Sequence, residues 1–481
     1  MWEFTSITDF LLGPIVLIMI VLFAKMYVSA KIQKHPEYKY FFPGLVAKLI
    51  GSLGLWFVYT FYYPGGDTFQ YFVSSVDTIN LFSVNPYGFF SMWLGPHDLA
   101  KTAFFDQYVR APFYYKDPNT YFVVKMIIPL AILSFKSYIV CSLLLATVSF
   151  FGIWSLYKIY IQEYPEIKKE LAIAIFFVPS VFFWGSGLLK DTITLSMVGF
   201  YVSSFYKLFI RRNQMFKNLL GLIISSFIIL SIKPYILIGL VPGSLFWIIN
   251  RVLSSIKGEV LRFFSAPVLI FLISVFGYAL LVSISGTLGS YSVDRVLKRA
   301  SEVQYDLKQD YYHGSSFDIG TYEANISSML LYAPAAINAA LFRPYIWEAN
   351  NIVMFISSIE NFITLFFTLR VLMFTRLFLW VKYLMTHHLL TFSIIFSLFF
   401  AFSVGISTSN FGSLVRYKIP AIPFFISSLF IIRHLRQKEI QFKKGKEATQ
   451  FTQPEMNNMI ERGVLAANNS SAPKIILCIF K

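Results

Sequence analysis

The residues of this sequence best suited to chemistry are ionisable side chains at the ends of apolar stretches. Seven stand out: Asp67, Lys190, Asp191, Lys233, Arg343, Glu348 and Arg416. Ionisable groups close to hydrocarbon are costly unless they are paired or hydrated, so several on one face of a protein indicate a common polar site. Four cations beside three carboxylates suit an anionic substrate.

The four cations and the first carboxylate suggest two different roles. Lys190, Lys233, Arg343 and Arg416 could hold a phosphate or diphosphate, arginine through its bidentate fork and lysine as a point charge. Asp67 follows a Pro-Gly-Gly turn, which lets backbone approach a ligand closely. Its carboxylate could accept the proton of an attacking hydroxyl.

Each of these positions also has a purely structural interpretation. Asp67 could cap the helix that follows it, and the two roles are compatible. Lys190 and Asp191 could form a tight turn, with Asp191 capping the next helix and Lys190 reaching toward the membrane surface. Lys233 precedes a proline and could mark a break between two helices.

The later residues have structural alternatives as well. Arg343 and Glu348 could pair with each other, and Arg416 could extend to the surface from the end of a span. Glu360 lies within an apolar stretch and must either pair with a buried polar group or line the site. The aromatic run 59–63 is typical of a membrane-interface belt, although exposed rings also stack on sugars.

Long apolar runs determine which elements carry these residues. The chain has 481 residues, of which 56% are hydrophobic and 14% charged. Uncharged runs of about 17–25 residues match the length of a helix that crosses a bilayer. The runs lack the two-residue alternation of a membrane barrel. The fold class predicted is all-α, a polytopic transmembrane helical bundle.

We predict about eleven spans, with the N-terminus outside and the C-terminus cytosolic. Basic residues concentrate in alternate connections, and such connections face the cytosol. The net charge of +16 is therefore assigned to cytosolic loops and not to nucleic-acid binding. The spans lie at about residues 10–30, 44–63, 138–157, 171–187, 192–209, 217–232, 235–250, 264–285, 350–372, 388–406 and 417–433.

This topology depends on one assignment. Residues 121–136 are apolar but interrupted by Lys125, Pro129 and Lys136, so we predict a helix at the membrane interface and not a crossing. With this assignment the sequence has two external loops, at about 64–137 and 286–348, each with interfacial helices. Residues 1–435 then form the transmembrane domain, and 436–481 a basic cytosolic tail that we expect to be disordered beyond about residue 445.

The sequence offers little support for a metal or a bound cofactor. The two cysteines, Cys141 and Cys478, lie far apart, and His387 and His388 are adjacent, which is the wrong spacing for ligands on one helix face. We expect no cofactor and no metal-binding residues, while a divalent cation stays open. No Gly-rich phosphate loop occurs.

Three short motifs carry a resemblance to a known family. Gly66-Asp67 follows an early span, Gly-Ser-Gly-x-x-Lys-Asp occupies 185–191, and Arg-Tyr-Lys-x-Pro occupies 416–420. Together with the interfacial helix, they resemble multi-pass glycosyltransferases of the GT-C type and exopolysaccharide-polymerase-like membrane proteins of bacteria. The resemblance covers most of residues 40–435.

The resemblance implies an enzyme that transfers a sugar from a polyprenyl-phosphate carrier on the outer face of the bacterial inner membrane. It implies that Asp67 is the catalytic base, and that Lys190, Lys233, Arg343 and Arg416 hold the phosphate. We assign Asp191 and Glu348 to the same substrate site. The expected partners are the lipid-linked sugar and membrane lipids, with no nucleic acid.

Two other classes of function remain open from the sequence. A transporter or flippase of a lipid-linked anion would place ionisable residues near the bilayer midplane, on helices interrupted by glycine or proline. A non-catalytic membrane subunit of an envelope complex would need none of these charges.

Overall fold

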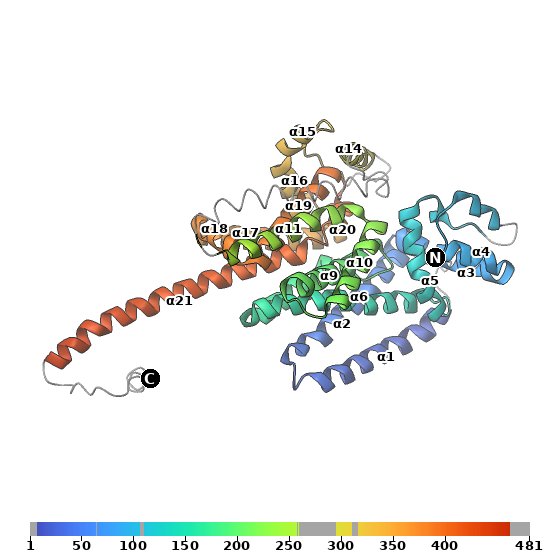
Figure 1. Ribbon diagram of the computed structural model, residues 1–481. Coiled ribbons are helices and arrows are strands. Elements are labelled where there is room, and N and C mark those ends of the chain that lie inside the picture. Colours follow the sequence, from blue (N-terminus) through green and yellow to red (C-terminus); the bar gives the residue numbers. More distant parts are fainter. Residues whose placement is uncertain are drawn as a thin grey trace. The chain divides into compact units, whose positions relative to one another are not determined.

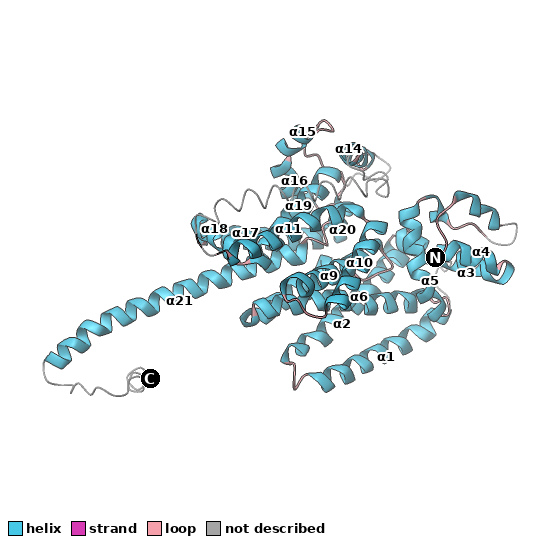
Figure 2. Ribbon diagram, viewed as in Figure 1, coloured by secondary structure: helices cyan, strands magenta, loops and turns pink. Residues whose placement is uncertain are grey.

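The computed structural model describes residues 7–63, 65–105, 110–256, 258, 295–309 and 316–461. Within these residues the secondary structure is helical, and no β-strand forms (Figure 1, Figure 2). The chain divides into two units, Met1–Ile431 and Ile432–Lys481, which are described separately. All candidate site residues belong to the first unit.

Eight helices of the described chain are long and apolar enough to cross a membrane. They are α1 (Ile7–Lys31), the continuous η1–α2–η2 segment (Pro36–Tyr62), α6 (Tyr138–Glu163), α9 with η6 (Lys190–Ile210), α10 (Met215–Ile232), α11 (Pro234–Ser255), α17 (Ile352–Phe374) and α19 (His388–Ser407). The helices α20 (Phe411–Tyr417) and α21 (Ile422–Glu461) form a ninth candidate span, bent by 65°. The predicted multi-pass helical membrane protein is therefore confirmed, while sidedness and the exact number of spans stay predictions.

Two of the eleven predicted spans have no counterpart among these helices. Residues 171–187 form two short helices, α7 (Lys168–Phe176) and α8 (Pro179–Trp184), so the single continuous helix predicted there is wrong. Val178 is extended because the proline after it disfavours the helical conformation. The predicted span 264–285 lies outside the described residues.

The first polar segment folds into a set of short helices ahead of α6. They are α3 (Asp67–Val84), α4 (Pro86–Trp93), η3 (Leu99–Phe104), η4 (Phe113–Lys116) and α5 (Pro118–Leu133). With 16 residues, α5 is shorter than the candidate spans. It contacts α3, α6 and α10 and buries Tyr121, Val124 and Ile128. Its predicted position at the membrane interface stays a prediction.

The second polar segment is also helical where it is described. It contains α14 (Val296–Asp306), α15 (Ile326–Leu331), α16 (Ala333–Phe342) and η9 (Ile346–Glu348). Between α17 and α19 lies the ten-residue α18 (Leu377–Thr386). Helix α16 packs closely on α19, because a methyl group on Gly405 would lie 2.0 Å from the Ala336 carbonyl oxygen.

The second unit, Ile432–Lys481, begins within α21, which ends at Glu461. Its first residues are rich in cations, among them Arg433, Arg436 and Lys438. A helix without packing partners is only marginally stable in water. The disorder expected beyond about residue 445 stays a prediction.

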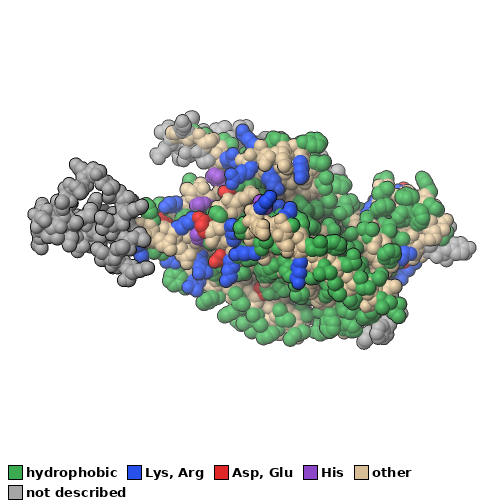
Figure 3. Space-filling view, turned by 90° about the horizontal axis from the view of Figure 1, so that it is seen from below, with side chains coloured by type: hydrophobic (Ala, Val, Ile, Leu, Met, Phe, Trp, Pro, Cys, Tyr) green, Lys and Arg blue, Asp and Glu red, His purple; other side chains and the backbone are tan. Residues whose placement is uncertain are grey.

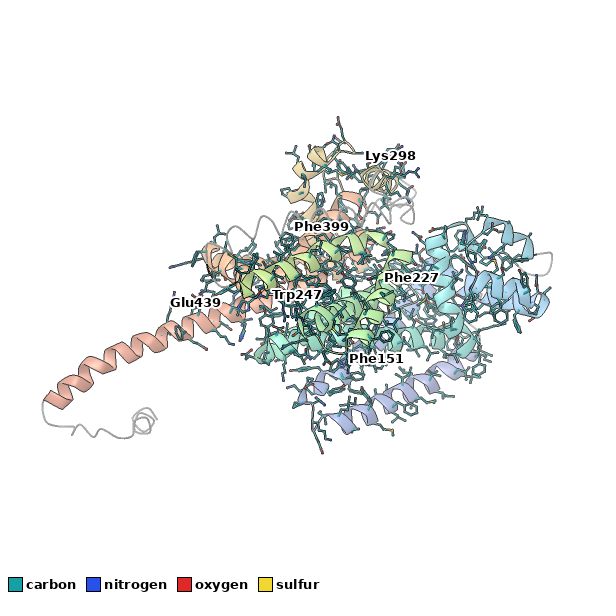
Figure 4. All side chains as sticks on the ribbon, in the orientation of Figure 1. Phe151, Phe227, Trp247, Lys298, Phe399 and Glu439 are labelled. Carbon is teal, nitrogen blue, oxygen red and sulfur yellow. The ribbon has the colours of Figure 1, made fainter. Side chains whose placement is uncertain are left out.

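Trp247 of α11, labelled in Figure 4, belongs to one cluster of buried aromatic rings in the bundle. Its ring centroid lies 5.7 Å from that of Tyr206 and 5.2 Å from that of Phe392, so it joins η6, α11 and α19. Helix α1 exposes large apolar side chains along its length, among them Leu11, Ile15, Ile18, Leu22 and Phe23. A broad hydrophobic area is visible in Figure 3, as expected for a surface that contacts lipid.

Glycine allows the two most intimately packed spans, α6 and α9, to approach. A methyl group on Gly199 would lie 2.2 Å from the Gly152 carbonyl oxygen, and one on Gly152 would lie 2.1 Å from the Ser196 carbonyl oxygen. Small residues permit such backbone contact between membrane helices. This crossing fixes the register of α9, whose first two residues are Lys190 and Asp191.

We expect Gly199→Ala to lower the thermal stability of the detergent-solubilised protein. Alanine favours helix by about 1 kcal/mol over glycine, but overpacking at a backbone contact costs about 1–3 kcal/mol or more. Gly239→Ala is the control, because its added methyl group would meet nothing closer than the Phe399 ring at 3.3 Å. Equal melting temperatures for the two variants would contradict the close crossing.

Candidate functional site

Five of the seven predicted site residues come together around one guanidinium group. Arg416 Nη2 donates to Asp67 Oδ2 at 3.0 Å and lies 3.5 Å from Asp191 Oδ2. Lys233 Nζ donates to Asp191 Oδ1 at 2.6 Å. Lys190 interacts electrostatically with Asp67, Asp191 and Lys233. We call these five residues the Arg416 cluster.

Asp67 is positioned by a glycine turn and is not the helix cap. Gly65 and Gly66 have φ values of +100° and +102°, in a region that favours glycine. Gly66 occupies the N-cap position, and Asp67 is the first residue of α3. The capping alternative is therefore wrong: the Asp67 carboxylate accepts from Arg416 and from the Tyr114 hydroxyl, which lies 2.9 Å from Oδ1.

Lys190 and Asp191 are the first two residues of α9, and Leu189 occupies the N-cap position. Asp191 consequently does not cap α9, contrary to the structural alternative. The turn before α9 is held from both sides: the Thr192 hydroxyl donates to the Gly187 carbonyl at 2.7 Å, and buried Lys48 of α2 donates to the Gly185 carbonyl.

Lys233 lies at the break between α10 and α11, as the structural alternative predicted. The break also places its ammonium group beside Asp191 and 4.7 Å from the centre of the Tyr417 ring. The side chains of Lys233 and Asp191 are only 7% and 1% exposed. Charges buried this deeply each need an opposite charge, which Lys233 and Asp191 supply to each other. Arg416 links the pair to the rest of the cluster, because its Nη2 atom lies 3.5 Å from Asp191 Oδ2.

Arg343 and Glu348 form a separate pair. Arg343 Nε donates to both Glu348 carboxylate oxygens, at 3.0 and 3.1 Å, and the guanidinium lies within 4.7 and 5.3 Å of the ring centres of Phe317 and Phe411, which stack on each other. Among the described residues, neither member forms an ion pair or a hydrogen bond with the Arg416 cluster. The structural pairing is confirmed, and the predicted part in substrate binding stays a prediction.

Three residues of the first polar segment contact the Arg416 cluster but were not identified as site residues from the sequence. Tyr114 of η4 donates to Asp67. Lys190 Nζ donates to the Thr120 hydroxyl at 2.5 Å and lies 3.9 Å from Asp117 Oδ2. The sequence signal was Asp-Pro-x-Thr at 117–120, a typical helix start, which predicts a cap but not its contact with a distant lysine.

Two adjacent residues of α17 hold parts of the chain near Arg416, one of them α8 and the other Lys418 at the end of α20. Glu360 accepts from the backbone N–H and the hydroxyl of Ser180, both at 2.6 Å, and so caps α8. Asn361 accepts from Lys418 Nζ at 2.6 Å. Helix α8 ends at Trp184, whose ring lies 5.8 Å from the Arg416 guanidinium. The pairing predicted for Glu360 is confirmed.

The charges of the cluster and its neighbour Asp117 balance as three cations and three carboxylates. Burial acts to raise the pKa of Asp67, and the Arg416 charge acts to lower it. The hydrogen bonds from Tyr114 and Arg416 and the Lys190 charge add to the lowering, and the resulting pKa lies below the ordinary value. Asp67 is therefore ionised at neutral pH, while its side chain stays 44% exposed and accessible.

This arrangement can bind an anion and accept a proton within one small region. The described residues contain no group of three or more histidine, cysteine or acidic side chains arranged to hold a metal ion. Comparison with protein-family models, curated proteins and solved structures finds no match to this chain.

We expect Asn361→Leu to destabilise the protein, because Lys418 is 1% exposed and would lose its hydrogen-bond acceptor. A buried charged donor left without a partner costs about 1–3 kcal/mol or more. Lys418→Met combined with Asn361→Leu should recover part of the lost melting temperature. Additive losses in the double variant would contradict a direct interaction.

The stability contribution of Asp67 should depend on pH. A carboxyl with a lowered folded pKa stabilises the fold above its unfolded pKa, about 3.9, and this contribution is lost as the pH falls through the folded value. The melting temperature of the wild type should therefore exceed that of Asp67→Asn by a constant amount from pH 7 to pH 5. The difference should shrink below about pH 4.

Asp77, on the same helix, provides a control of opposite sign. Burial raises its pKa to about 6, against a smaller lowering by Arg110. Its ionised form is therefore disfavoured by the fold. Asp77→Asn should match the wild type below about pH 4 and become more stable than the wild type as the pH rises through 6. Parallel pH profiles for the two variants would contradict both assignments.

Proposed function

We propose that this chain is a membrane glycosyltransferase or polysaccharide polymerase that uses a polyprenyl-phosphate-linked sugar. The observation that carries the proposal is the sharing of Arg416 between Asp67 and Asp191, with Lys190 and Lys233 alongside. A phosphate needs converging cations, and a hydroxyl acceptor needs a nearby base. The Arg416 cluster supplies both.

In the proposed reaction, the acceptor hydroxyl oxygen attacks the anomeric carbon of the donor sugar and forms the new glycosidic bond. The bond from that carbon to the phosphate oxygen breaks, and its electron pair leaves with the lipid phosphate. The hydroxyl proton goes to Asp67. Arg416 and Lys190 stabilise the negative charge that grows on the departing phosphate.

Substrate binding would itself activate the base. Arg416 lowers the pKa of Asp67 in the free protein, whereas burial acts to raise it. When the donor phosphate takes over the guanidinium, Asp67 loses part of the interaction that favours its ionised form. Its pKa then rises toward the value expected from burial, which makes it a stronger base. Asp191 keeps Lys233 in place during this exchange.

The proposal includes the location and partners implied by the resemblance. The reaction takes place at the outer face of a bacterial inner membrane, where lipid-linked sugars and their acceptors meet. The donor lipid lies in the bilayer beside the spans, and its phosphate enters at the level of the Arg416 cluster. Nucleic acid takes no part.

Transport of a lipid-linked anion is the second candidate. One observation favours it: the charges of the cluster lie at interruptions between helices, namely the α8–α9 turn, the α10–α11 break and the bent α20–α21 pair. Many secondary transporters bind their substrates at such discontinuous helices. A transporter moves the intact lipid, whereas a transferase separates the sugar from the carrier.

The test is transfer by the purified protein in liposomes that contain polyprenyl-phosphate glucose or polyprenyl-phosphate mannose with a radiolabelled sugar, with a soluble oligosaccharide added to supply the acceptor hydroxyl. We expect free polyprenyl phosphate to accumulate with the wild type, and Asp67→Asn to lower its rate about 10²-fold or more. Asp77→Asn is the matched control and should keep the wild-type rate. Full activity of Asp67→Asn would refute the role of this base, and movement of intact donor without release would favour transport.

A further inference from the structure

A π-helical turn at the end of α2 directs one tyrosine of the aromatic run 59–63 toward the Arg416 cluster. The turn is η2 (Val58–Tyr62), directly before the glycines that precede Asp67. Such turns insert an extra residue into a helix and occur frequently at functional sites. Tyr59 is 8% exposed, whereas Tyr62 and Tyr63 are 47% and 41% exposed. Tyr59 therefore does not belong to an exposed belt.

The surroundings of Tyr59 place it at the site. A methyl group on Gly66 would lie 2.8 Å from Cε1 of Tyr59, so the ring packs directly on the turn that positions Asp67. The phenol group is close enough to Arg416, Asp67 and Asp191 to interact electrostatically with all three. Its interactions with these groups are electrostatic only, and its hydroxyl forms no hydrogen bond with the part of the chain that the structure describes.

Arg416 also has unused hydrogen-bonding capacity. Its Nε atom is buried and forms no hydrogen bond with the part of the chain that the structure describes. Nη2 is the nitrogen that reaches both Asp67 and Asp191. A buried N–H donor without an acceptor is rare in proteins and requires an explanation. A ligand oxygen would satisfy it.

We propose that Tyr59 is a ligand-binding residue whose hydroxyl donates to a phosphate oxygen of the lipid-linked donor, alongside Arg416 Nε. A phenol keeps its proton at neutral pH and can therefore donate to an anion without adding charge to a balanced cluster. This inference rests on the proposed function, because it names a further contact of the same anion site. It also gives a reason why Tyr59 is the one aromatic side chain of the run 59–63 that is buried.

A purely structural role for Tyr59 predicts a different outcome. If only the ring mattered, as packing for the Gly65-Gly66 turn, then Tyr59→Phe would leave ligand binding unchanged. Because the hydroxyl has no protein partner in the described structure, its removal should leave the stability of the ligand-free protein unchanged. The phenylalanine variant therefore separates the hydroxyl from the ring without threatening the fold.

The experiment measures binding of farnesyl phosphate to the full-length protein in detergent, with farnesol as the uncharged comparison. We expect Tyr59→Phe to weaken farnesyl phosphate binding about 10-fold, as for loss of a hydrogen bond to a charged group, with no change for farnesol. Tyr63→Phe is the matched control from the same aromatic run and should bind as the wild type does. Melting temperatures without ligand check that both variants are folded.

Two results would overturn the inference. Wild-type affinity in Tyr59→Phe would remove the hydroxyl from the site, and equal affinity of the wild type for farnesyl phosphate and farnesol would remove the anion site altogether. Binding does not depend on sugar transfer, so the two proposals fail separately. Weakened binding in Tyr59→Phe with no transferase activity in the wild type would support the anion site and refute the transferase.

Discussion

The structure around the candidate site depends on the burial of opposite charges that satisfy one another. Asp191 is 1% exposed and would be unstable there without Lys233 and Arg416. The same requirement brings together the starts of α3 and α9, the α10–α11 break and α20, because α9 contributes two charges, each of the others contributes one, and every charge needs an opposite one nearby. Charge pairing thus acts as a constraint on topology as well as a source of chemistry.

Supporting contacts extend this constraint away from the cluster. Lys48 of α2 holds the turn before α9, and Glu360 and Asn361 of α17 hold α8 and the residues after Arg416. Each contact places a polar side chain against the end of a short or interrupted helix, where backbone or charged groups lack partners. The interruptions are therefore stabilised features of the fold.

Composition and charge predicted the fold class and eight helices that are long and apolar enough to cross a membrane, because long uncharged runs have few alternatives to membrane helices. The interruption at Pro179 was missed because the apolar run continues through it, and hydropathy does not register backbone geometry.

For the site, the residue types indicated five members of the cluster. The pairing of Arg343 with Glu348 followed from their spacing, but its separation from Arg416 depends on tertiary packing. Tyr114 gave no signal because aromatic residues are abundant throughout the chain, and Tyr59 was noted only as part of the aromatic run 59–63.

The close contact of α6 with α9 at Gly152 and Gly199 has a consequence for motion. Two backbones that touch cannot slide or rotate past each other without a steric clash. Helix α9 and its two charged residues are therefore held in a fixed position relative to α6. Arg416 lies beside a bent connection, where a small change in backbone torsion moves the side chain without repacking a long helix. Any opening that admits a lipid headgroup would therefore hinge on the Arg416 side.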